Sequence, residues 1–274
     1  WYLFFFFNDT ASTGIYTLSL PDALPIWIAA SYSTLRLVNT TFIGNVSKWG
    51  GGMWTYSSAP SLNQVIFSSN SATYRGGGLC NVFSRVTLVN TTFSNNTATR
   101  YSNTAGGGLF NYGSSGNPGA VTIANGIFWG NTDSVNGSGT TAAQLGDNGY
   151  GTFDVSYSLV QGSSVYTGTR NTNLNPLFVD ANGTDNIVGT ADDNLRLQRG
   201  SPAVDSGSNS AVSADVADLD DDESTSEQTP YDMEGKTRIM GRFDVSPLIV
   251  DMGPYELASV HGMSVYLPTV MRNQ

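Results

Sequence analysis

The sequence predicts an all-β fold, a solenoid in which short repeated coils of parallel strands stack on one another. A phrase with Phe at its first position and Asn at its fourth recurs four times, at residues 42–45, 67–70, 93–96 and 128–131. The first three copies are each followed by a glycine triplet, and the unit repeats every 25 or 26 residues until an insertion lengthens the third copy. A period of this length is typical of a solenoid.

The strands are expected just before each repeated Phe. Each unit is too short to bury an apolar face alone and too rich in Gly, Asn, Ser and Thr for a pair of helices, so stacking must supply the core. The runs before the phrase alternate apolar and polar residues, with the apolar positions at Leu35 and Leu37, Val86 and Leu88, and Val121 and Ile123. We therefore expect parallel strands over residues 35–161, with the four repeated Phe side chains superposed in one ladder.

The small and polar residues of the repeat predict how the coils turn. The repeated Asn is expected at a tight corner, because Asn tolerates the left-handed backbone. The glycine triplets are expected where successive backbones approach closely. Cys80, the sole cysteine, follows the second triplet and is expected to be a small residue of the core, so no internal disulfide forms.

The Phe-x-x-Asn phrase with its glycine triplet resembles the polymorphic outer-membrane-protein repeat and, more broadly, right-handed parallel β-helix proteins of bacterial cell surfaces. The resemblance covers residues 35–161 and implies a right-handed parallel β-helix of four to five coils. It specifies function weakly, since adhesins, lyases, tailspikes and inert stalks share such helices.

We interpret the first 26 residues as having another origin than the repeats. Residues 8–26, NDTASTGIYTLSLPDALPI, resemble the translation of a sequencing-library adapter, NDTATTEIYTLSLHDALPI. We therefore interpret residues 1–26 as an artefact of read assembly and expect no biological function from them, although they could add strands to the open end of the stack. The native start is then expected to be missing together with earlier coils, so the sequence says nothing about a signal peptide.

The pattern changes after the last repeat, and we divide the chain into repeats at 27–165, a C-terminal module at 166–257 and a tail at 258–274. The module contains NPLFVD at 175–180, SPAVDSG at 201–207 and DMGPYE at 251–256. These phrases resemble the terminal region of secreted β-helix proteins grouped as choice-of-anchor Q. Because a solenoid requires a polar end, we expect this module to be an irregular, acidic cap that closes the stack.

The charge distribution separates the two halves of the chain. Residues 27–132 hold five Lys or Arg and no Asp or Glu, whereas residues 133–274 hold twenty acids and seven cations. The net charge of −10 argues against nucleic acid as a partner. No apolar run is long enough for a transmembrane helix. We expect a monomer.

Two sets of residues are candidate sites. The first set lies in two acidic loops, at residues 180–185 and 218–223. Both loops place oxygen side chains at alternate positions, as Ca²⁺ prefers, and neither fits an EF-hand. The alternative is that both are solvated loops. The candidate Ca²⁺ ligands are Asp180, Asn182, Asp185, Asp218, Asp220 and Asp222.

The second candidate site is a stripe of cations and aromatic residues that precede the glycine triplets, which stacked coils would align. Such a stripe suits an acidic polysaccharide, because aromatic faces stack on sugar rings and cations attract its charge. Ordinary turn residues are the alternative. The residues are Lys48, Trp49, Tyr74, Arg75, Arg100 and Tyr101.

We predict no catalytic residues from the sequence. The repeats before residue 133 hold no carboxylate for a lyase or glycosidase, and the sole His, His261, lies in the tail. We expect a secreted or cell-surface protein with a structural or adhesive role. The alternative is a fragment of a β-helix polysaccharide lyase or glycoside hydrolase whose catalytic coils lie upstream.

Overall fold

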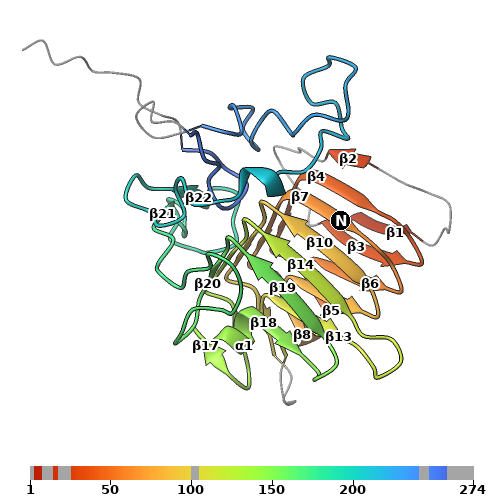
Figure 1. Cartoon of the computed structure of the whole chain (residues 1–274). Coiled ribbons are helices and arrows are strands. Elements are labelled where there is room, and N and C mark those ends of the chain that lie inside the picture. Colours follow the sequence, from red (N-terminus) through yellow and green to blue (C-terminus); the bar gives the residue numbers. More distant parts are fainter. Residues whose placement is uncertain (1–2, 8–14, 18–25, 100–104, 241–246, 258–274) are drawn as a thin grey trace, which may run out of the picture.

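A computed structural model of the chain describes residues 3–7, 15–17, 26–99, 105–240 and 247–257. Its regular structure is almost entirely β, which confirms the all-β prediction, and most strands lie in three largely parallel sheets (Figure 1). Among the described residues the helical elements are one short helix, α1 (Thr141–Gln144), and one 3-10 turn, η1 (Asn209–Ala211).

Each sheet collects strands from successive repeat units. The first sheet has the order β1 (Leu3–Phe7), β3 (Ile26–Ser31), β6 (Met53–Tyr56), β9 (Leu79–Val82), β13 (Leu109–Tyr112) and β18 (Leu145–Asp147). The second contains β2 (Ile15–Thr17), β4 (Arg36–Ile43), β7 (Ser61–Ser68), β10 (Arg85–Val89), β11 (Thr92–Ser94), β14 (Ala120–Ala124), β15 (Ile127–Trp129), β19 (Thr152–Ser156) and β20 (Leu159–Val160). The third has the order β17 (Gly137–Ser138), β16 (Thr132–Asp133), β12 (Thr97–Ala98), β8 (Ser71–Arg75) and β5 (Val46–Trp49).

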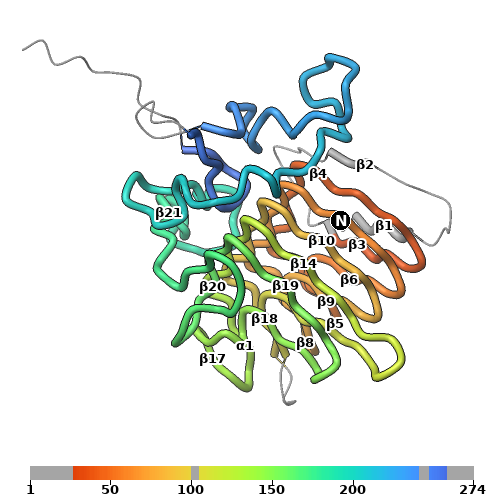
Figure 2. The backbone as a smooth tube through the Cα atoms, in the orientation of Figure 1, coloured from red at the N-terminus to blue at the C-terminus, as the bar shows by residue number. Residues whose placement is uncertain are grey.

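The parallel pairing keeps equivalent residues of the units in register. In the second sheet Phe42 pairs with Phe67, Phe67 with Phe93, and Phe93 with Phe128. Figure 2 shows the result, successive turns of the backbone lying one beyond the other from orange to green. At the N-terminal edge β1 pairs with β3 and β2 pairs with β4, so the described part of residues 1–26 extends two sheets.

The repeated Phe side chains form the predicted ladder inside the molecule. All four are fully buried. Neighbouring rings are stacked, with centroids 4.7 Å apart for Phe42 and Phe67, 4.5 Å for Phe67 and Phe93, and 4.6 Å for Phe93 and Phe128. The shared spacing of the phrase therefore encodes a continuous aromatic column, and this prediction is confirmed.

The apolar residues predicted on the inward face surround that column. The six alternating residues from Leu35 to Ile123 are all buried and belong to one core cluster with the four Phe. Cys80 is also buried, as expected, and burial raises the pKa of its thiol to about 12. A thiol in this state is a packing residue, because the reactive form is the thiolate.

The repeated Asn has a different role from the one predicted. The left-handed backbone belongs to the residue before it, at Gly44, Ser69, Asn95 and Gly130. The Asn side chains are buried and bond to one another instead. The Nδ2 of Asn45 donates to the Oδ1 of Asn70 at 2.7 Å, and the same bond joins Asn70 to Asn96 and Asn96 to Asn131 at 2.9 Å.

This asparagine ladder explains the correction physically. An amide has both donors and acceptors, so each Asn can accept from one neighbouring unit and donate to the next. The second donor of Asn96 bonds to the carbonyl of Phe67 at 2.9 Å. At Asn70 and Asn96, in the middle of the ladder, the stacking itself therefore satisfies the buried amide, whereas Oδ1 of Asn45 at the N-terminal end has no hydrogen-bond partner.

The glycine triplets lie where the units approach most closely, as predicted. Gly52 donates to the carbonyl of Gly78 at 2.9 Å. A Cβ added to Gly78 would lie 2.8 Å from the carbonyl oxygen of Gly108 and 2.8 Å from the ring of Phe93. Any larger residue there would push the backbone away from the aromatic column.

The C-terminal module covers the end of the stack only with its first residues. Tyr157 donates to the carbonyl of Thr169, and Val160 to that of Thr172, while Tyr166 packs against the core cluster. After this the chain turns away and forms an antiparallel pair, β21 (Phe178–Asp180) and β22 (Asn194–Leu197).

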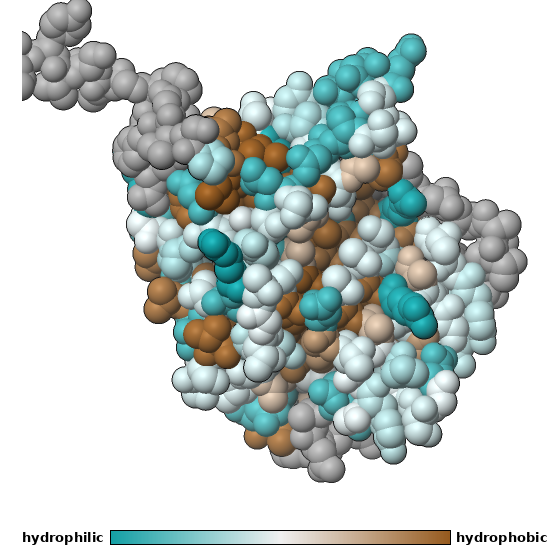
Figure 3. Space-filling model, viewed as in Figure 1, coloured by the Kyte–Doolittle hydropathy of each residue, from teal (hydrophilic) through white to brown (hydrophobic). Residues whose placement is uncertain are grey.

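The sequence predicts that the module caps the end of the stack. In the structure the rest of the module lies along the side of the second sheet. Leu197, Val204 and Met252 pack in a second buried cluster with Ile127 and Leu159. Figure 3 shows hydrophilic residues concentrated on the protruding loop of this module, which is light blue in Figure 1.

A second ladder of polar side chains attaches the module. Asn90 bonds to Asn63, and Asn125 bonds to Asn90 at 2.9 Å. The free ends of this ladder bond to the module, because Asn63 donates to Thr229 at 3.0 Å and Asn125 accepts from the backbone of Ser208 at 2.7 Å. Polar side chains on the side of the stack thus provide the hydrogen bonds that hold the module in place.

Candidate functional sites

The predicted stripe of cations and aromatic residues is assembled on strands β5 and β8. The rings of Trp49 and Tyr74 are stacked, with centroids 4.8 Å apart and planes at 17°. The ammonium of Lys48 lies over the Tyr74 ring at 5.2 Å from its centroid. Lys48 and Trp49 are exposed, and Tyr74 is partly exposed. Arg100 and Tyr101 lie outside the described residues.

Arg75 joins the stripe from its other side. It pairs with Trp49 in the parallel register of β5 and β8. Its guanidinium carbon lies 4.5 Å from the centroid of Phe110 and 6.0 Å from that of Tyr112. Both Lys48 and Arg75 therefore rest on aromatic faces, which reduces the cost of placing like charges on neighbouring strands.

A hollow of about 380 Å³ lies beside the stripe and was not predicted. Trp27 and Trp54 of the first sheet form one wall, and Lys48 and Trp49 of the third sheet form the other. The indole of Trp27 donates to the carbonyl of Gly50 at 2.7 Å, which fixes that wall. The position of Trp54 two residues after the glycine triplet at 50–52 was the signal in the sequence.

The first acidic loop is closed by its own hydrogen bonds. Asp192 accepts from the backbone of Thr184 at 2.6 Å and from its hydroxyl at 2.7 Å. The hydroxyl of Thr190 also bonds to Asp192, and these bonds lower the pKa of the Asp192 carboxyl below its usual range. Of the predicted ligands here, Asp180, Asn182 and Asp185 are exposed, and no described carboxylate cluster includes Asp180 or Asp185.

The second acidic loop gathers its predicted residues. Asp218, Asp220 and Asp222 each offer an oxygen within 4.8 Å of the others. Asp220 also belongs to a second group of the same dimensions with Asp215 and Glu227, which the sequence reading missed. Burial raises the pKa of Asp215, and Glu227 and Asp220 raise it further.

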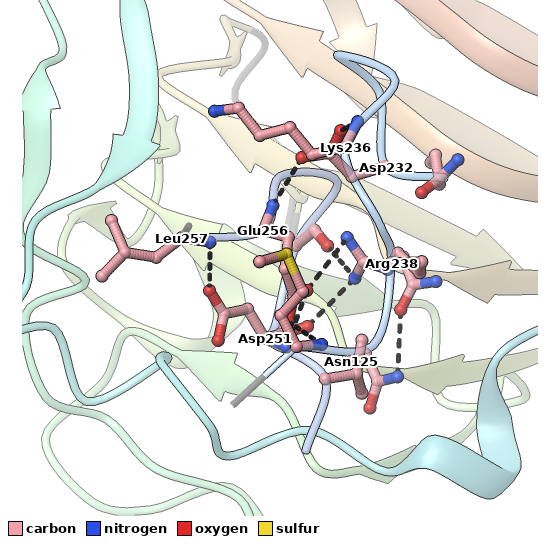
Figure 4. Close-up of polar contacts among 12 residues, drawn as sticks. Asn125, Asp232, Lys236, Arg238, Asp251, Glu256 and Leu257 are labelled. Carbon is pink, nitrogen blue, oxygen red and sulfur yellow. Dashed lines mark hydrogen bonds and ion pairs between the residues drawn. The ribbon is translucent and has the colours of Figure 1, made fainter. Parts of the chain in front are cut away.

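The DMGPYE phrase forms a buried network of charged groups around Arg238 (Figure 4). The Nη2 of Arg238 donates to the carbonyls of Asp251 at 3.0 Å and Gly253 at 2.6 Å, and its Nη1 lies 3.8 Å from the carboxylate of Glu256. Glu256 in turn accepts from the backbone of Asp251 at 3.1 Å. Asp232 accepts from the backbone of Glu256 at 2.8 Å.

This network holds loops of the module together. The carboxylate of Asp251 accepts from the backbone of Asp205 at 2.7 Å and of Leu257 at 2.8 Å, so it joins the SPAVDSG phrase to the end of the module. Burial raises the pKa of Asp251 to about 6 and that of Glu256 to about 9. We assign these residues a structural role.

Comparison with known proteins adds no identification. No protein-family model matches the chain, and no curated protein matches it. Within the described residues, no helix has the length and apolar character needed to cross a membrane.

Proposed function

We propose that the chain is part of a secreted or cell-surface right-handed parallel β-helix protein that displays a binding surface for an acidic polysaccharide. The three largely parallel sheets with units in register support the helix. The right hand follows from the strong preference, about 98%, of parallel crossover connections for that hand.

The repeat and module families suggested by the sequence belong to the same proposal. The four-membered Phe column gives the polymorphic outer-membrane-protein type of repeat a structural purpose. The buried network of Asp251, Glu256 and Arg238 gives the choice-of-anchor Q phrase one as well. In this proposal both motifs build a scaffold, and binding is left to residues outside them.

The observation that carries the proposed ligand is the stack of Trp49 and Tyr74, with the ammonium of Lys48 over the Tyr74 ring and Arg75 paired with Trp49 in the strand register. A flat aromatic pair next to a tryptophan-walled hollow suits the apolar face of a sugar ring. The two cations suit a carboxylate or sulfate group on that sugar. Since residues 27–132 contain no Asp or Glu, nothing in these units repels an anionic chain.

The scale of the stack also suits a polymer. Parallel neighbours repeat at about 4.8 Å, so equivalent side chains of adjacent units form a continuous row. Trp49 and Tyr74 have this spacing on neighbouring strands, although Trp49 is paired in register with Arg75. A long glycan could therefore lie along the row and contact several units at once.

A glycan array with acidic and neutral polysaccharides tests the proposal. The full chain should bind acidic members, and Trp49→Ala should abolish or strongly weaken binding. Trp129→Ala, on the second sheet, is the matched control and should leave binding unchanged. Binding that ignores Trp49→Ala would exclude the stripe, and release of new reducing ends would favour the alternative, a carbohydrate-active enzyme.

A further inference from the structure

We propose that the C-terminal module binds one Ca²⁺ ion between Asp215, Asp220 and Glu227, at the base of its protruding acidic loop. These residues each offer an oxygen within 4.8 Å of the other two. They lie deeper than the set predicted from the sequence, with which they share only Asp220. The inference is independent of the glycan surface, which lies on other strands.

The base of the loop is held in place by backbone pairing. Ala214 and Gln228 form an antiparallel bridge, and Asp215 donates its backbone N–H to the carbonyl of Glu227 at 2.8 Å. The neighbouring Thr229 accepts from Asn63 of the β-stack at 3.0 Å. Asp215 and Glu227 are therefore brought together by the fold, and their proximity is independent of the loop tip.

The decisive observation is that each of the three carboxylates keeps one buried oxygen without a hydrogen-bond partner. These atoms are Oδ1 of Asp215, Oδ1 of Asp220 and Oε1 of Glu227. Asp215 is only 1% exposed, and its other oxygen accepts from the backbone of Leu219 at 2.7 Å. The other oxygen of Glu227 accepts from the hydroxyl of Ser224.

Three carboxylates this close together, each with an unpartnered buried oxygen, favour a bound cation. A buried carboxylate oxygen without a donor loses its hydration, and three neighbouring carboxylates repel one another. A cation removes both penalties together. An all-oxygen donor set favours a hard ion over zinc or copper, and metal–oxygen distances of about 2.3–2.6 Å let Ca²⁺ bridge ligands at this spread.

The outer group, Asp218 and Asp222 with Asp220, is better satisfied by the protein. Asp218 accepts from the backbone of Asp222 at 3.0 Å, and Asp222 accepts from the backbone of Ser224 at 2.8 Å. Asp222 is also exposed. These bonds shape the loop and leave the inner group as the site.

Calorimetric titration of the chelator-treated full chain with Ca²⁺ tests the site. We expect one ion per chain, with Asp215→Asn and Glu227→Gln each weakening affinity by about tenfold or more. Asp221→Asn removes the same charge from an exposed loop residue outside both groups and should leave affinity unchanged. Mg²⁺, which requires shorter and more regular coordination, should bind more weakly.

Three results would overturn the inference. The first is the absence of Ca²⁺ binding by the wild-type chain. The second is equal weakening by Asp221→Asn, which would indicate a general effect of charge. The third is loss of binding in Asp218→Asn or Asp222→Asn while Glu227→Gln binds normally. Because Asp215→Asn could unfold the module, the partly exposed Glu227 supplies the deciding variant, and its thermal unfolding should lose the Ca²⁺-dependent rise of the wild type.

Discussion

The ring of Phe93 lies between those of Phe67 and Phe128, stacked on the first at 4.5 Å and on the second at 4.6 Å. Residues far apart in sequence thus form one column because the units are in parallel register. The column contributes to stability through apolar burial and through ring stacking.

Phe93→Ala should lower the free energy of unfolding by about 3–5 kcal/mol, since it leaves a cavity in the middle of the column. Chemical denaturation followed by circular dichroism measures the loss. Phe83→Ala is the control in the same unit, because Phe83 is only partly buried and contacts Tyr56 and Tyr112 edge-on. Equal losses in the two variants would contradict the role of the column.

Asn96→Ala should also destabilise the protein, by about 2–4 kcal/mol, because it leaves the buried amide of Asn70 without its acceptor and the carbonyl of Phe67 without its donor. Asn95→Gly is the matched control. Asn95 has a φ of 55°, and glycine already occupies the equivalent position in two other units, at Gly44 and Gly130. A near-neutral Asn96→Ala would show that the ladder adds nothing to stability.

The pH dependence of stability should report the buried Glu256. Burial and the neighbouring Asp251 raise its pKa from 4.5 to about 9. A group whose pKa is higher in the folded state stabilises that state fully when the pH is below the pKa of the unfolded state. The contribution is lost as the pH rises through the pKa of the folded state. Stability should therefore fall between about pH 4.5 and 9, and Glu256→Gln should flatten this part of the curve.

Glu234 provides the opposite case as an internal comparison. The hydrogen bond from Arg196 lowers its pKa from 4.5 to about 2. Its contribution is present above pH 4.5 and is lost as the pH falls toward 2. Glu234→Gln should flatten only this acid limb. Urea unfolding of both variants across the pH range measures the free energy of unfolding at each pH. Stability curves that run parallel to that of the wild type would refute the assigned pKa directions.

The sequence predicts the repeat well because the repeat is periodic. The positions of Phe42, Phe67, Phe93 and Phe128 establish the register of the stack without any knowledge of long-range contacts. The role of the repeated Asn was harder to predict, because the same residue type suits both a left-handed corner and an amide ladder. The deciding information is burial, and it comes only from the stacked units.

The position of the C-terminal module could not be predicted from the sequence. Asn63 bonds to Thr229 across 166 residues, and Asn125 bonds to Ser208 across 83. No periodicity connects these residues. The same limit applies to the acidic site, since Asp218, Asp220 and Asp222 alternate visibly, whereas Asp215 and Glu227 meet only through the pairing of their backbones.

The most direct test of the central claim is the salt dependence of binding between the full chain and an acidic oligosaccharide. Wild-type affinity should fall as salt screens the cations over about 8 Å at physiological ionic strength. Arg75→Ala should reduce that slope, Trp49→Ala should lower affinity at every salt concentration, and Arg36→Ala, an exposed cation on β4, should change neither. The proposed binding surface would be contradicted if the wild-type chain bound no acidic oligosaccharide at low salt. It would also be contradicted if Trp49→Ala and Arg75→Ala left the affinity unaltered.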